Sequence, residues 1–140
     1  MVKPLYWDDT TKNLKESSTD KIELTNSNTW TKAQKVTPVQ LTDGASIATD
    51  ASLSNVFYVT LAGNRTLANP SNLVEGGTYI FEITQDGTGS RTLAYGNVFG
   101  WPDKTAPVLT TAANAVDIIT GVYRNSIPQC NILQNCGVPV

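Results

Sequence analysis

Hydrophobic and polar positions alternate most regularly between Asn55 and Tyr123. Two runs in this stretch, 55–68 and 78–96, each start with β-branched and aromatic residues, pass through a glycine-containing turn and continue into Arg-Thr-Leu-Ala. Tyr, Phe, Val, Ile and Thr favour strands, whereas Gly-Asn and Asp-Gly favour tight turns. We therefore predict two β-hairpins, each of which returns through the same tetrapeptide.

A third strand is predicted at residues 115–123, which are rich in β-branched side chains. Its even-numbered and odd-numbered residues lie on opposite faces, because side chains alternate along a strand. Asp117 has apolar neighbours on both sides. It therefore either faces solvent or is buried and paired with Arg65 or Arg91.

Shorter elements are predicted before this stretch. Residues 3–7 and 13–16 would form a small hairpin, and 45–48 a short strand. The run 34–41 contains Pro38, which lacks a backbone donor and so favours an edge strand. Together these elements predict an all-β fold, an antiparallel and jelly-roll-like β-sandwich with an extended N-terminal arm.

The expected division of the chain follows from its apolar content. We expect an N-terminal docking arm at 1–33, a β-sandwich body at 34–125 and a C-terminal strand or arm at 126–140. The length fits one domain with a real core.

The N-terminal third has too few large apolar residues to form a core alone. It is either a flexible arm or an arm that docks on a neighbouring subunit or a larger particle. Tryptophan in so polar a segment favours docking, because tryptophan is enriched at interfaces. The candidate docking residues are Leu5, Tyr6, Trp7, Leu14 and Trp30.

Charge and composition narrow the function classes. The chain has a formal net charge of −2, a pI of about 4.9 and no histidine. A basic face for nucleic acid is therefore not expected, and the commonest general base and metal ligand is missing. We expect a non-enzymatic protein without a cofactor, a metal ion or a nucleic-acid partner.

Nothing in the sequence indicates a membrane partner. No apolar run approaches the roughly 20 residues that span a bilayer. The N-terminus, Met-Val-Lys-Pro-Leu-Tyr-Trp-Asp, lacks the apolar segment of a secretory signal. We expect synthesis and folding in a cytoplasm.

Two further groups of residues are candidates for chemistry or binding. Cys130 and Cys136 are not spaced as Cys-x-x-Cys, and they are too few for a zinc site, so they form either a local disulfide or two free thiols. Tyr95, Phe99 and Trp101 lie on or beside a loop rich in Pro and Gly. They either pack against the core or a subunit, or form an exposed aromatic contact that stacks on a sugar ring.

Four motifs in the body resemble a domain of tailed-bacteriophage virion proteins. They are V-T-L-A-G-N-R-T-L-A-N-P, G-G-T-Y-I-F-E-I-T-Q-D-G-T-G-S-R-T-L-A-Y-G, F-G-W-P and A-P-V-L-T-T-A-A-N-A-V-D-I-I-T-G-V-Y. They occur in this order over residues 56–123, about half of the chain. Similar domains occur in tail fibres and in small structural proteins of phage particles. The opening K-P-L-Y-W-D also looks like the start of small phage fibre or decoration proteins.

The resemblance implies a non-enzymatic virion structural protein, made in the cytoplasm of a bacterial host. The main expectation is a capsid decoration or head-fibre subunit that docks on the particle surface, since no heptad stalk or long shaft is seen. The alternative is a tail-fibre or carbohydrate-binding module for receptor contact. The implied partners are further copies of the chain in a homotrimer, other capsid or tail proteins, and a host-surface glycan.

Overall fold

The structure is a computed structural model that describes residues 6–8, 13–15 and 35–137. The chain divides into two compact units, residues 1–34 and 35–140. The larger unit contains the two sheets that form the body.

The first unit contains a small hairpin. Strand β1 (Tyr6–Asp8) pairs antiparallel with β2 (Asn13–Lys15), and Trp7 lies opposite Leu14 in the ladder. The predicted hairpin is therefore confirmed. Among the candidate docking residues, Leu5, Trp30 and the side chains of Tyr6, Trp7 and Leu14 lie outside what the structure describes, so docking stays a prediction.

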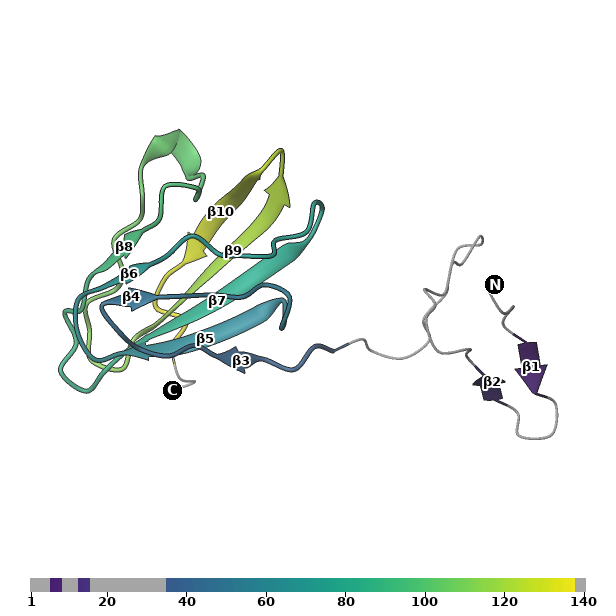
Figure 1. Cartoon of the computed structure of the whole chain (residues 1–140). Helices are drawn as coiled ribbons and strands as arrows, with labels where there is room; N and C mark the ends of the chain where they lie inside the picture. Colours follow the sequence, from purple (N-terminus) through teal and green to yellow (C-terminus); the bar gives the residue numbers. More distant parts are fainter. Residues whose placement is uncertain (1–5, 9–12, 16–34, 138–140) are drawn as a thin grey trace. The chain divides into compact units, whose positions relative to one another are not determined.

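The second unit has a five-stranded sheet of order β10-β9-β7-β5-β3 and a three-stranded sheet of order β4-β6-β8, which face each other (Figure 1). Its single described helical element, η1 (Pro102–Lys104), is a short 3-10 turn. The strand bounds are β3 Val39–Gln40, β4 Ser46–Ile47, β5 Val56–Leu61, β6 Arg65–Leu67, β7 Thr78–Gln85, β8 Leu93–Tyr95, β9 Val116–Arg124 and β10 Ile127–Leu133.

The chain alternates between the two sheets and forms three stacked coils, β3–β4, β5–β6 and β7–β8. Successive coils pair in parallel. In the larger sheet Phe57 lies opposite Val39 on one side and Phe81 on the other. In the smaller sheet Leu67 lies opposite both Ile47 and Tyr95. Equivalent side chains therefore stack inside the body, as in solenoid proteins.

The two predicted hairpins are wrong. Strands β5 and β6 belong to different sheets, and each pairs in parallel with the next coil. A glycine-containing turn changes the direction of the chain but does not specify the partner strand. Here the turns cross between sheets, which supplies the crossover that parallel pairing requires. The repeated tetrapeptides are also out of register, because Arg65 lies opposite Leu93 and not Arg91.

An antiparallel region completes the larger sheet. Strand β9 pairs antiparallel with β7 on one side and β10 on the other. The predicted third strand is confirmed as β9, and β3 lies at a sheet edge, as Pro38 indicated. The all-β, sandwich-like fold is therefore confirmed, but the larger sheet is mixed and the smaller one parallel, so parallel coils replace the expected antiparallel, jelly-roll-like order.

The core lies between the two sheets and follows from the strand alternation. Along β5, Phe57, Val59 and Leu61 are buried, while Tyr58 and Thr60 between them are exposed. A fully buried aliphatic or aromatic side chain of this kind contributes about 1.5–3 kcal/mol. The largest fully buried side chains come from both sheets and are Phe57, Ile47, Leu61, Leu67, Ile83, Ile119 and Val59.

Candidate functional site

An aromatic row runs from the core to the loop after β8. Phe57 stacks on Phe81 with ring centroids 5.4 Å apart, and Phe99 meets Phe81 edge-on at 6.3 Å. Trp101 lies 4.7 Å from Tyr95 at 62° and 6.1 Å from Phe99 at 15°. Both geometries are favourable for aromatic pairs. The structure therefore brings together all three aromatic residues that the sequence singled out.

The three residues differ in exposure. Phe99 is only 8% exposed, so it belongs to the core and is not an exposed contact. Tyr95 and Trp101 are partly buried and pack against that core. The Tyr95 hydroxyl is itself buried. Burial raises the pKa of this phenol, with further increases from Asp117 and Cys130, so the phenol stays neutral. Trp101 remains as the side chain best placed for external contact.

Backbone hydrogen bonds hold the loop that carries Trp101. The Gly100 amide donates to the Pro128 carbonyl at 2.8 Å, and the Cys130 amide donates to the Gly100 carbonyl at 2.8 Å. The Gly96 amide donates to the Leu67 carbonyl, also at 2.8 Å. The loop is thus tied to both sheets. A ring held in this way loses little conformational entropy when it binds a partner.

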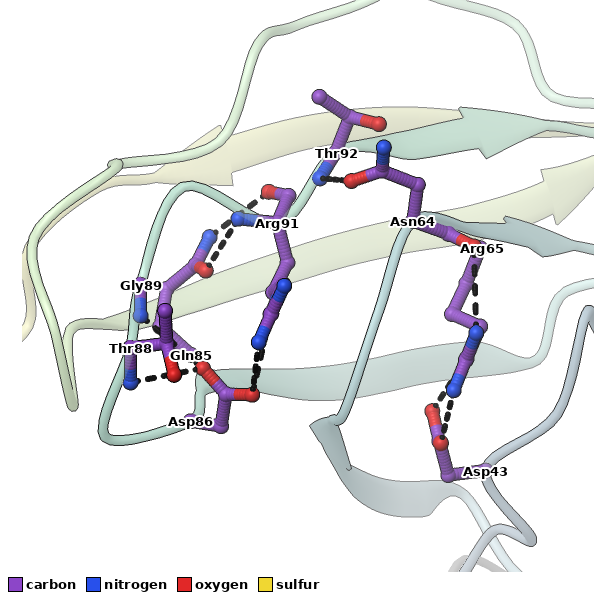
Figure 2. A network of polar contacts seen from close by, with 9 residues as sticks. All are labelled: Asp43, Asn64, Arg65, Gln85, Asp86, Thr88, Gly89, Arg91 and Thr92. Atoms are coloured by element: carbon purple, nitrogen blue, oxygen red, sulfur yellow. Dashed lines mark hydrogen bonds and ion pairs between the residues drawn. The ribbon is translucent and has the colours of Figure 1, made fainter.

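Charged pairs occur at the turns that lead from the larger to the smaller sheet. Figure 2 shows Arg65 facing Asp43, with Nε donating to Oδ1 at 2.9 Å and Nη2 to Oδ2 at 2.7 Å. Arg91 donates from Nε and Nη2 to Oδ2 of Asp86, at 3.0 and 2.7 Å. The hydrogen bonds from Arg65 and Arg91 lower the pKa values of Asp43 and Asp86, respectively.

The same network connects successive coils. The Asn64 Oδ1 atom accepts a hydrogen bond from the Thr92 amide at 3.0 Å (Figure 2). Gln85 is 2% exposed, and its amide group bonds to both the amide and the carbonyl of Arg91. A side chain at Gly89 would meet the Thr111 carbonyl at 2.6 Å. These contacts fix the β7–β8 turn, so we interpret the network as a structural clamp.

Asp117 is a buried carboxylate with its own partners. It is 2% exposed, which excludes the solvent-facing alternative. Its Oδ2 accepts from the Thr110 amide at 2.6 Å and its Oδ1 from the Asn135 amide at 2.8 Å. The pairing with Arg65 or Arg91 is not formed. Asp117 instead fastens the β8–β9 loop and the segment after β10 to β9.

The two cysteines are free thiols. Cys130 is buried in the core and donates to the Pro128 carbonyl, while Cys136 is partly exposed. Burial raises the pKa of the Cys130 thiol to about 11, so it is protonated at neutral pH. A protonated, buried thiol is a poor nucleophile.

Within residues 6–8, 13–15 and 35–137, no group of three or more Cys, Asp or Glu side chains gathers closely enough to hold a metal ion. No helix within the same ranges is long and apolar enough to cross a membrane.

Residues 45–126 match a family model described as "Putative phage tail fibre C-terminal domain". The match covers more than half of the chain and runs from just before β4 to the turn after β9. The chain therefore belongs to this family and is a tailed-phage virion structural protein. No curated protein and no solved structure matches the chain significantly.

Proposed function

We propose that the chain acts in a tail fibre as a non-enzymatic module that contacts the receptor on the host cell. The family match carries this proposal, because the matched family is one of tail-fibre domains. The same match supports the receptor-contact alternative better than capsid decoration.

The proposed mechanism is adhesion by a preformed surface. Trp101 would supply the main contact, because it is partly exposed while its loop is bonded to β6 and β10. An indole ring offers a large apolar face together with one N–H donor. That combination suits a sugar ring, so we propose a host-surface glycan as the receptor.

Two parts of the proposal concern assembly. The segment 1–33 would attach the body to other virion proteins through its tryptophans, and the assembled form would be a homotrimer. Repeating one weak contact three times raises avidity without any new interaction within each site. A weak glycan contact by each subunit would then hold a particle on a cell.

Changing Trp101 tests this function. We expect the full-length Trp101→Ala protein to bind host cells at least about tenfold more weakly than the wild type, a loss of about 1.4 kcal/mol. Labelled protein titrated onto host cells measures the affinity, and circular dichroism verifies the fold. Trp101→Phe should retain most of the binding, because it keeps an aromatic face.

Val108→Ala is the matched control, because Val108 lies on the same β8–β9 connection and is 75% exposed. It should bind like the wild type. Unchanged cell binding by a folded Trp101→Ala protein would contradict the role of Trp101.

A further inference from the structure

Both Asp-Gly dipeptides of the chain have an arginine partner. These dipeptides are Asp43-Gly44 and Asp86-Gly87. Arg65 binds the first aspartate and Arg91 the second, each through its Nε and Nη2 atoms (Figure 2). In the described body, residues 35–137, the aspartates that precede larger residues have no arginine partner, and these are Asp50, Asp103 and Asp117. The arginines therefore accompany the aspartates that are followed by glycine.

An Asp-Gly dipeptide is chemically vulnerable, because glycine has no side chain to shield the aspartate from its own backbone nitrogen. That nitrogen attacks the aspartate Cγ atom. The N–H proton and the OH group of the carboxylic acid leave together as water, so a cyclic succinimide forms. Water then opens the ring at either carbonyl. Opening at the backbone carbonyl gives isoaspartate, in which the main chain runs through the former side chain and is one atom longer.

The turn that carries Asp86 does not itself prevent this reaction. The Asp86 side chain is 23% exposed and Gly87 is exposed, so water reaches both residues. The Gly87 amide donates no hydrogen bond within the described part of the chain, which leaves its nitrogen free to attack. A side chain at Gly87 would meet nothing within 4 Å, so no neighbouring group covers this position.

Arg91 opposes the reaction at Asp86 in two ways. It holds Oδ2, while the amides of Thr88 and Gly89 donate to Oδ1 at 3.0 and 2.9 Å, so the carboxylate is fixed from both sides. A fixed carboxylate cannot turn its Cγ atom freely toward the Gly87 nitrogen. The hydrogen bonds from Arg91 also lower the pKa of Asp86, which makes the protonated form that loses water scarcer.

Arg65 acts on Asp43 in the same way. Its Nε and Nη2 atoms each hold a different carboxylate oxygen, at 2.9 and 2.7 Å, and the contact lowers the pKa of Asp43. The Asp43 side chain is 24% exposed, so it also lies within reach of water. The two dipeptides are therefore protected by the same type of contact, although their arginines lie at different distances along the chain.

We propose that Arg65 and Arg91 protect the two Asp-Gly dipeptides from conversion to isoaspartate. This role is chemical and adds to the structural clamp described above. A virion protein is not replaced after the particle leaves its host cell, so isoaspartate would accumulate during the life of the particle. An additional main-chain atom at Asp86 would displace the groups that hold the β7–β8 turn. The proposal does not depend on the receptor contact.

Ageing of the full-length protein at neutral pH tests the proposal. Peptide mapping with electron-transfer fragmentation distinguishes isoaspartate from aspartate at each position. We expect Arg91→Gln to form isoaspartate at Asp86 at least about threefold faster than the wild type, a change of about 0.7 kcal/mol in the barrier, as suits a partly exposed pair. Arg65→Gln should do the same at Asp43. Equal rates in the wild type and both variants would overturn the proposal.

A rescue variant separates the chemical role from a purely structural one. Gly87→Ala, combined with Arg91→Gln, should return isoaspartate formation at Asp86 to the wild-type rate or below it. The added methyl group hinders the attack, and the site has room for it. A double variant that reacts as fast as Arg91→Gln would contradict the succinimide route.

Two further variants complete the experiment. Arg124→Gln is the matched control, because Arg124 pairs with Glu75 at an exposed position and should leave both rates unchanged. Circular dichroism verifies the fold of each variant. If Arg91→Gln does not fold, Arg91→Lys takes its place, because lysine keeps the charge but lacks the paired N–H donors. It should still react faster at Asp86 than the wild type, and an unchanged rate would refute the role of Arg91.

Discussion

Replacing Phe57 by alanine should lower the free energy of unfolding by about 3–5 kcal/mol. Phe57 is completely buried, stacks on Phe81 and lies opposite Val39 on the first coil. The variant leaves a cavity at the point where all three coils meet in the larger sheet. Urea denaturation followed by tryptophan fluorescence measures the loss.

The neighbouring residue is the matched control. Tyr58 points to the other face of β5 and is 39% exposed, so Tyr58→Ala should cost less than about 1 kcal/mol. A double-mutant cycle of Phe57→Ala with Phe81→Ala should show a coupling of about 0.5–1.5 kcal/mol, because the rings are in contact. Additive effects of the two changes would contradict direct pairing of β5 with β7.

Asp117→Ala should lower the free energy of unfolding by roughly 2–4 kcal/mol. The change removes two partly buried hydrogen bonds, from the Thr110 and Asn135 amides, and a hydrogen bond to a charged group contributes about 1.5–3 kcal/mol. Burial of the carboxylate is itself unfavourable, so its removal offsets part of this loss. The expected loss of stability is therefore smaller than the sum of the largest values for the two hydrogen bonds. The same denaturation experiment measures the change.

Two control variants make the Asp117 result specific. Glu82→Ala changes an exposed acidic residue on β7 and should stay within about 0.5 kcal/mol of the wild type. Asp117→Asn should be more stable than Asp117→Ala but less stable than the wild type. Its carbonyl oxygen can still accept from one backbone amide, whereas its NH2 group would face the other amide, which is also a donor. Full stability of Asp117→Ala would show that these two hydrogen bonds are not needed to hold the loops.

Strand positions were predictable from the sequence because side-chain alternation is a local property. Strands β5, β7 and β9 lie where the alternating runs predict them. Strand pairing was not predictable in the same way. Gly63-Asn64 and Asp86-Gly87 indicate that the chain changes direction, but a turn within one sheet and a turn between two sheets use similar residues.

The polar network was missed, although a signal for it exists. Both arginines begin the repeated tetrapeptide, and an Asp-Gly turn occurs before each, at Asp43-Gly44 and Asp86-Gly87. Each pair lies at a turn between the sheets. From the sequence, either arginine is a candidate partner of Asp117, because a buried carboxylate usually requires a cation. Backbone amides meet that requirement here.

The candidate site was predictable only in part. The aromatic loop was identified because three rings in a Pro- and Gly-rich segment are unusual. The burial of Phe99 depends on its contact with Phe81, which is distant in sequence.

The position of the chain on the phage particle distinguishes a tail-fibre module from a capsid decoration protein. Antiserum raised against the protein, bound to whole particles and detected with gold under the electron microscope, measures that position. We expect gold confined to the end of the tail. Gold spread over the heads would contradict the tail-fibre function and support capsid decoration.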